Sequence, residues 1–185
     1  MSKFIEIVDF WMKHKKDWFY VSGEFDDLCF RKYGTYFEDT ELLGDSKNPD
    51  EILGKIILLD QISRNIFRGT AKAYSYDNKA CMLMLNHFHI SNELDGWKKI
   101  FFLMPFKHSE NIHNQEYNIK LWNSIIDSTF DISLEKLYLK NLETCKKHYK
   151  IIKKFKRFPK RNYILNRNTT EKEEIYLLEN PHGFI

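Results

Sequence analysis

Apolar residues recur every three to four positions along most of the chain, and stretches that alternate strictly between apolar and polar residues are missing. This spacing is typical of α-helices that bury one face, whereas half-buried strands alternate with a period of two. The pattern predicts about seven to nine helices joined by short connections, without a Gly/Ser linker or a low-complexity tract. We therefore expect an all-α protein in which residues 1–185 form a single helical domain, built as a layered array of helices.

Capping residues and prolines predict where these helices begin and end. Asn48 is a suitable N-cap and Pro49 a suitable first residue for one helix, and Thr170 begins a capping box for a last short helix. Pro105 is expected to break a helix that starts near Trp97, and Ser109 to cap the next one. The other expected segments are an apolar stripe at 4–11, a helix around 25–29 with 36–43 as a candidate continuation ending at Gly44, a helix capped by Asp77, and a long helix from about Ser133 to Phe155 that Pro159 stops.

Length and cysteine content favour a protein that folds without disulfides or structural metal ions. A chain of 185 residues buries roughly two-thirds of the surface that its unfolded form exposes, so neither a metal ion nor a disulfide is required. Cys29, Cys81 and Cys145 are far apart, odd in number and set within helical patterns, which indicates reduced thiols and a cytoplasmic location. Glu6 and Asp9 interrupt the first apolar run, so we expect neither a signal peptide nor a membrane anchor there.

Charge is distributed unevenly along the chain. Residues 140–161 hold ten Lys or Arg and one acid, Glu143, a net charge of +9, which leaves −6 for the rest of a chain whose net charge is +3. Such a stretch can attract RNA or acidic partners. The sequence carries no recognised nucleic-acid motif, so nucleic acid ranks behind a small anion and an acidic peptide as the expected partner.

The first polar cluster follows an apolar helical stripe in the stretch ILLDQISRNIFRG. Positions four apart share a helix face, so Ile52, Ile56, Asp60 and Arg64 form one line, which Arg68 is expected to extend by one step. Buried charges need partners, and Asp60 is therefore expected to hold Arg64. Two interpretations stay open: an internal salt bridge that joins helices, or a rigid guanidinium pocket for an anion.

The second cluster, KRFPKRNYILNR, spans residues 156–167 and contains Arg157, Arg161, Asn162 and Arg167 around apolar residues. Its Arg-Asn pair repeats that of the first cluster, so two such turns could converge on one pocket. The alternative is a solvated basic surface, which is our interpretation of the neighbouring lysines.

The third cluster is MPFKHSEN, where His108 precedes an expected helix start. A purely structural interpretation is capping by Ser109 with Glu110 in the first turn. A functional interpretation makes His108 a general base or hydrogen-bond donor that Glu110 orients. The sequence contains no HExxH, CxxC, Walker or GxGxxG motif, so we expect neither a metal nor a cofactor.

Several of these motifs resemble one known family. The stretches VDFW (8–11), LLDQISRNIFRGTAKAYSYD (58–77), FFLMPFKHSEN (101–111), HYKIIKKFKRFPKRNYILNR (148–167) and TTEKEEIYLL (169–178) are similar to the motifs of the domain of unknown function 924 family of tetratricopeptide-like helical proteins. The resemblance implies a tetratricopeptide-like helical array, a class that often binds extended peptides, and it implies no reaction. Lys156 and Asn166 stand where that family usually has Gly, which implies turns with positive φ that Asn tolerates better than Lys. Ser63 and Lys160 replace the family's usual Pro and His.

From these observations we expect the three clusters to meet in one pocket that binds a phosphate or carboxylate group on arginine side chains, with His108 and Glu110 on one wall. The alternatives are an enzyme, a hydrolase or group transferase on a phosphorylated small molecule, with His108 as acid/base assisted by His148, and a scaffold for an acidic peptide. Whether the protein is an enzyme, and its oligomeric state, stay open. The candidate catalytic residues are His108 and Glu110, and the candidate ligand-binding residues are Asp60, Gln61, Arg64, Asn65, Arg68, Arg157, Arg161, Asn162, Arg167 and His148.

Overall fold

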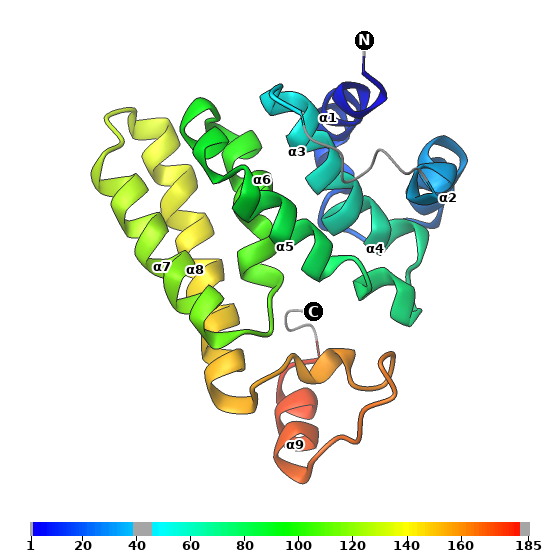
Figure 1. Ribbon diagram of the computed structural model, residues 1–185. Coiled ribbons are helices and arrows are strands. Elements are labelled where there is room, and N and C mark those ends of the chain that lie inside the picture. Colours follow the sequence, from blue (N-terminus) through cyan, green and yellow to red (C-terminus); the bar gives the residue numbers. More distant parts are fainter. Residues whose placement is uncertain (1, 39–45, 182–185) are drawn as a thin grey trace. The chain divides into compact units, whose positions relative to one another are not determined.

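The computed structural model describes residues 2–38 and 46–181, which form nine α-helices and several short 3₁₀ turns and contain no strand (Figure 1). This confirms the all-α prediction. Contacts divide the chain into two compact units, Met1–Pro105 and Phe106–Ile185, each treated separately below. The single-domain and tetratricopeptide-like predictions stay predictions.

The first unit holds the helices of the N-terminal half. They are α1 (Lys3–Lys13), α2 (Gly23–Tyr33), α3 (Pro49–Ile57), α4 (Ser63–Ile66), α5 (Asp77–Asn86) and most of α6 (Gly96–His108), with a π turn at Leu58–Ile62 between α3 and α4. Aromatic residues fill its core: the ring of Phe101 lies 5.7 Å from that of Trp11 and 4.7 Å from that of Trp18. Trp18 also donates its indole N–H to the Trp11 carbonyl at 2.8 Å, which satisfies a polar atom that would otherwise be costly to bury.

The second unit is built on two long helices that lie side by side, α7 (Ile112–Asp127) and α8 (Ile132–Phe155) (Figure 1). The rings of Trp122 and Tyr138 pack between them, 5.2 Å apart. A 3₁₀ turn (Pro159–Arg161) and α9 (Glu171–Glu179) follow. Ile151, Ile152 and Phe158 form the apolar cluster against which this last segment packs.

Two predicted helix starts are confirmed by hydrogen bonds. The Asn48 side chain accepts from the backbone N–H groups at positions 50 and 51, at 2.9 and 3.2 Å, and Pro49 is the first residue of α3. Thr170 and Glu173 form the reciprocal capping box of α9. Both signals depend only on residues within one turn, which is why sequence alone sufficed.

The predicted break at Pro105 is wrong, because α6 continues through it to His108. Proline removes one backbone hydrogen bond, and burial of the following Phe106, 2% exposed, can outweigh that loss so close to the helix end. Ser109 consequently does not cap α7. Asn111 does so, accepting from the N–H of His113 at 2.8 Å.

The long helix ends at Phe155, as predicted, although the left-handed conformation of Lys156 ends it before Pro159 is reached. Two other predicted boundaries differ from the structure. Tyr76 is the N-cap of α5, while Asp77 is its first residue and pairs with an arginine described below. Of the candidate continuation 36–43, the structure shows a 3₁₀ turn at Gly34–Glu38, and positions 39–45, Gly44 included, lie outside the described residues.

Positive φ occurs at both positions where the family resemblance implied glycine. Lys156 has φ 64° and Asn166 has φ 51°. Side chains rarely adopt this conformation because Cβ crowds the backbone, and Asn accommodates it more readily than Lys.

The three cysteines are free and buried, as expected for structural thiols. Burial raises the pKa of Cys29 to about 12 and that of Cys81 to about 11, so neither is a reactive thiolate near neutral pH. Within residues 2–38 and 46–181, no helix combines the length and apolar character needed to cross a bilayer.

Candidate functional site

In the first unit, two carboxylates hold the guanidinium of Arg64. Its Nε donates to the Asp60 carbonyl at 2.8 Å, and its Nη2 donates to Asp77 Oδ1 at 2.9 Å and lies 3.6 Å from Asp60 Oδ1. Asp60 is completely buried and also accepts from the Gln61 amide. Burial alone would lower the pKa of Arg64, but the charges of Asp77 and Asp60 outweigh it and raise that pKa. The predicted pair of Asp60 and Arg64 is therefore confirmed.

Arg68 does not extend this line, because α4 ends at Ile66. It turns instead to Asp26 on α2, donating Nη2 to Asp26 Oδ1 at 2.8 Å. The Asn65 amide donates to the same oxygen at 2.9 Å. Asp26 is thus a member of the first cluster that the sequence interpretation missed.

Negative charge exceeds positive charge in this cluster. Three carboxylates, those of Asp26, Asp60 and Asp77, surround the guanidinium groups of Arg64 and Arg68. The excess negative charge would repel a further anion. One guanidinium nitrogen, Arg64 Nη1, is nevertheless buried without a hydrogen-bond partner in the described part of the chain. The geometry favours the salt-bridge interpretation for this cluster.

Replacing Arg64 by methionine is expected to lower the free energy of unfolding by about 3 kcal/mol, because Asp60 would stay buried without its cation. Urea denaturation followed by circular dichroism measures this loss. The matched control is Arg68→Met, whose partly exposed ion pair is worth less than about 1 kcal/mol. Equal small losses in both variants would show that Asp60 does not depend on Arg64.

In the second unit, Glu110 ties the C-terminal segment to the loop before α7. Its carboxylate accepts from Arg167 Nη1 at 2.7 Å, from Arg167 Nη2 at 3.1 Å and from the backbone N–H of Phe158 at 2.7 Å. Burial alone would raise the pKa of Glu110, but these hydrogen bonds, with the charge of Arg161, lower it overall. Glu110 thus stays ionised and fixes the position of the segment that carries Arg161.

Arg157 makes a second bidentate ion pair. Its Nε and Nη2 donate to the two oxygens of Glu173 at 2.7 and 2.8 Å. The hydrogen bond from Arg157 is the largest cause that lowers the pKa of Glu173 to about 2. Asn162, beside this pair, donates to Thr169 Oγ1 at 3.4 Å, while its own Oδ1 is buried without a partner in the described residues. Arg157 therefore braces α9, and its guanidinium is already occupied by a carboxylate.

Four chargeable side chains gather in the interior of the second unit. They are Lys107 and His108 from the end of α6, His148 from α8 and Arg161 from the 3₁₀ turn, and each is less than a tenth exposed. Arg161 Nη2 donates to the His108 carbonyl at 3.1 Å, and its guanidinium lies 4.6 Å from the Phe158 ring. The two imidazole rings are 6.3 Å apart. Lys107 Nζ donates to Asn141 Oδ1 at 3.2 Å. We call these four residues the buried cationic cluster.

The environment of His148 shows how positive this cluster is. Its Nδ1 lies 2.8 Å from the Thr144 carbonyl, which only accepts, so Nδ1 carries the proton and Nε2 keeps its lone pair. Burial lowers the pKa of His148 to about 3, and the charges of Lys107, His108 and Arg161 act in the same direction. His148 is consequently neutral at physiological pH.

Comparison with known proteins decides the family. Residues 7–181 match the family described as bacterial protein of unknown function (DUF924). The chain belongs to this family. Among solved structures it is similar to that of the protein of unknown function ATU0120 from Agrobacterium tumefaciens, with 29% sequence identity, a TM-score of 0.78, and coverage of 95% of this chain and 97% of the other. No curated protein matches the chain.

The second and third predicted clusters of this DUF924 protein meet within one unit. Glu110 contacts Arg167, and His108 contacts Arg161 through its carbonyl and His148 through its ring. The first cluster belongs to the other unit. The roles predicted for His108 and Glu110 in catalysis stay predictions.

Sequence reasoning missed two polar residues in the interior of the second unit, Lys107 and Asn141, whereas Cys145 was predicted as a reduced thiol within a helical pattern. A signal was present: Asn141, Cys145 and His148 follow one another at helical spacing within the buried stripe of α8. Polar residues at such positions indicate either a satisfied network or a site. In the described residues no group of three or more His, Cys, Asp or Glu side chains is placed to hold a metal ion.

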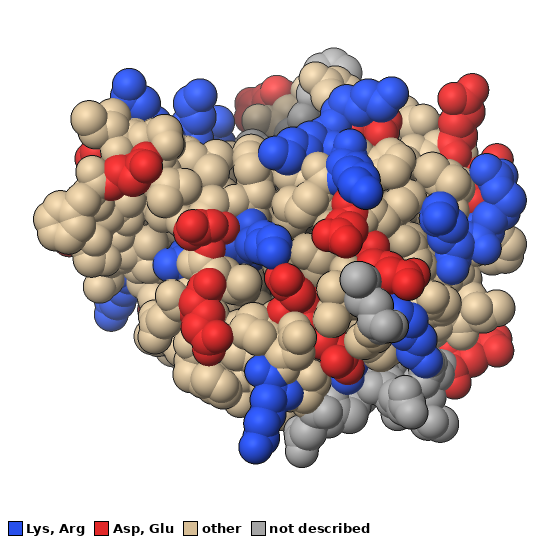
Figure 2. All heavy atoms as spheres, turned by 90° about the horizontal axis from the view of Figure 1, so that it is seen from above, with Lys and Arg blue, Asp and Glu red and all other residues tan. Residues whose placement is uncertain are grey.

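The exposed lysines of α8 fit the interpretation of a solvated basic surface. Lys147, Lys150, Lys153 and Lys154 are exposed, while the cationic residues Lys107 and Arg161 are buried. Figure 2 shows lysine and arginine side chains interspersed with aspartate and glutamate on one face of the described chain. That mixture of charges does not favour binding of a nucleic-acid backbone to that face.

Proposed function

We propose that this DUF924 protein binds a small anion, a carboxylate or phosphate group, at the buried cationic cluster of Lys107, His108, His148 and Arg161. The observation that carries the proposal is the gathering of two cations and two imidazoles in the interior of one unit. Placing cations away from water costs free energy, which an anion offsets more strongly there than at the surface. This set retains three of the residues predicted from sequence and adds Lys107.

The arginines outside this cluster have another task in the proposal. Arg64, Arg157 and Arg167 each face a carboxylate of the same chain and thereby hold the scaffold together. Arg161 donates to a backbone carbonyl and lies over the Phe158 ring, and both of these groups are uncharged. The charge of Arg161 adds to the positive potential around His148. Since all four cluster residues are buried, a ligand must enter by local opening, and binding is expected to be slow.

The test is a thermal-shift titration with inorganic phosphate, sulfate and acetate at ionic strength held constant with sodium chloride. An anion present at about 100 times its dissociation constant stabilises the folded protein by about 2.7 kcal/mol. Lys107→Met, which keeps the side-chain length and removes the charge, is expected to abolish the shift. Lys150→Met is the matched control, because it removes an exposed lysine of α8 and changes the net charge equally.

Two outcomes would contradict the proposal. One is a wild-type protein that none of the three anions stabilises. The other is equal loss of the anion response in Lys107→Met and Lys150→Met, which would indicate nonspecific screening of surface charge.

A further inference from the structure

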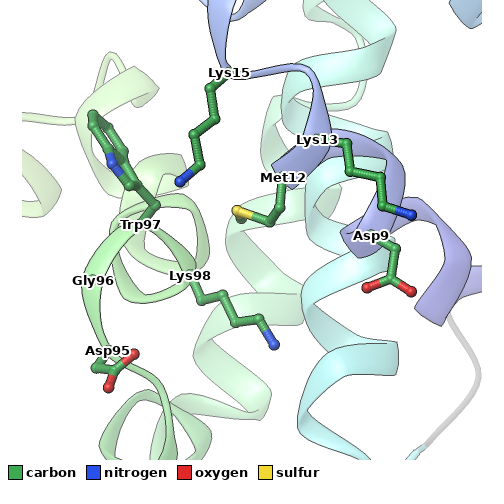
Figure 3. A pocket seen from close by; sticks show the side chains of 8 residues that line it. All are labelled: Asp9, Met12, Lys13, Lys15, Asp95, Gly96, Trp97 and Lys98. Atoms are coloured by element: carbon green, nitrogen blue, oxygen red, sulfur yellow. The ribbon is translucent and has the colours of Figure 1, made fainter.

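A separate cavity of about 390 Å³, largely open to solvent, lies in the first unit, where α1 and the turn after it approach the start of α6 (Figure 3). Its volume is within the range of small-molecule sites, roughly 300–1,000 Å³. None of its residues belongs to the clusters described above. The cavity is lined by Asp9, Met12, Lys13, Lys15, Asp95, Gly96, Trp97 and Lys98.

One wall of this cavity is apolar and held in place. The Trp97 ring lies 4.9 Å from the Trp18 ring and 6.1 Å from the Phe101 ring, so the buried aromatic core fixes its orientation. Met12 supplies a flexible thioether that adapts to the shape of a ligand. Phe19, 65% exposed and 6.2 Å from Trp97, continues the apolar surface outside the cavity.

Lysines supply the charge beside this wall. Lys98 donates to Asp50 at 2.8 Å, whereas Lys13 and Lys15 form no ion pair within the described residues. In Figure 3 the Lys15 side chain extends toward Trp97 and Met12, while Asp9 lies beside Lys13 on the far side of Met12. The Lys15 ammonium therefore lies on the side of the cavity that carries the indole, while Asp9 lies on the other side of Met12.

We propose that this cavity binds a small organic anion with a flat apolar ring, such as an aromatic carboxylate. The ring would lie against Trp97 and Met12, and the carboxylate would face the Lys15 ammonium. Aromatic rings gain from offset or edge contacts with an indole beyond simple burial of area. The site is independent of the anion site proposed in the second unit.

The test uses three probes that separate ring from charge: phenylacetate, acetate and 2-phenylethanol. Binding is followed by the indole N–H signals of the four tryptophans in NMR spectra, with Trp97→Phe identifying the signal of Trp97. Phenylacetate is expected to shift the Trp97 signal most, and to bind about tenfold more tightly than acetate and about threefold more tightly than 2-phenylethanol. Phenylacetate that shifts no indole signal, or shifts all four equally, would overturn the proposal.

A charge variant tests the role assigned to Lys15. Lys15→Met is expected to weaken phenylacetate about threefold, the size of a solvent-exposed ion pair, and to leave 2-phenylethanol unchanged. Lys16→Met is the matched control, since Lys16 is the next residue and does not line the cavity. Equal phenylacetate affinity in the wild type and Lys15→Met would rule out the proposed contact. Because Lys107 lies in the other unit, Lys107→Met should bind phenylacetate normally, whatever its response to phosphate.

Discussion

Replacing Gly54 by alanine is expected to lower the free energy of unfolding by about 4 kcal/mol, the largest loss that we expect from one methyl group in this chain. A Cβ at position 54 would lie 1.9 Å from the carbonyl oxygen of Phe4 and 2.7 Å from its carbonyl carbon. Both are backbone atoms, so no change of rotamer relieves the overlap. Helices α1 and α3, which pack closely here, would have to separate along their buried faces.

Guanidinium denaturation of the purified variants measures this effect. Gly23→Ala provides the control, because a Cβ at position 23 meets nothing within 4 Å. That change is expected to be neutral or to stabilise the protein by up to about 1 kcal/mol through the unfolded state. A cost below about 1 kcal/mol for Gly54→Ala would mean that α1 does not need this close approach.

Gly54 also illustrates what the sequence could and could not predict. Its neighbours Ile52 and Ile56 lie on the predicted apolar stripe and are fully buried, as the helical spacing required. The need for glycine between them comes from the Phe4 backbone, 50 positions earlier in the chain, and no local pattern encodes that approach. Local signals therefore predicted the helix, whereas the requirement for glycine at position 54 comes from the helix that packs against it, α1.

The charged residues show the same difference between contacts that local sequence predicts and contacts that depend on distant parts of the chain. Asp60 and Arg64 are four apart on nearly continuous helical turns, so their pairing followed from local geometry. Glu110 and Arg167 are far apart in the sequence, and their bidentate pair depends on how the C-terminal segment folds back. Sequence reasoning predicted Arg167 as a ligand-binding residue because its carboxylate partner was distant.

Within the second unit, this pairing has a consequence for the proposed function. Glu110 neutralises Arg167 and Glu173 neutralises Arg157, so the arginines that looked most available in the sequence are occupied. Lys107 and Arg161 are buried, and their charges act in the same direction on His148. Burial was not evident for Lys107, because Lys is rarely placed in a protein interior.

Stability is expected to fall as pH decreases from about 6.5 toward 3, because His148 resists protonation in the folded protein. In the unfolded chain the imidazole takes up a proton near pH 6.5, whereas burial together with Lys107, His108 and Arg161 holds the folded pKa at about 3. Above pH 6.5 the imidazole is neutral in both states and contributes no difference. Below it only the unfolded state gains a proton, so the free energy of unfolding decreases, by on the order of 5 kcal/mol over the whole window.

Urea denaturation between pH 7 and pH 4 measures this loss, and His148→Gln isolates it from the titration of carboxylates. The variant is expected to lose less stability than the wild type over that range, whereas His113→Gln, at an exposed position, should follow the wild type. Coincident pH profiles for the wild type and His148→Gln would refute the argument.

Sulfate connects this pH dependence with the proposed anion site, since its charge stays constant over the same range. A bound anion favours the protonated imidazole and so raises the folded pKa of His148, which lessens the loss at low pH. Sulfate should therefore stabilise the wild type more at pH 5 than at pH 7, and this difference should be smaller in His148→Gln. Equal stabilisation at both pH values would place the bound sulfate away from His148.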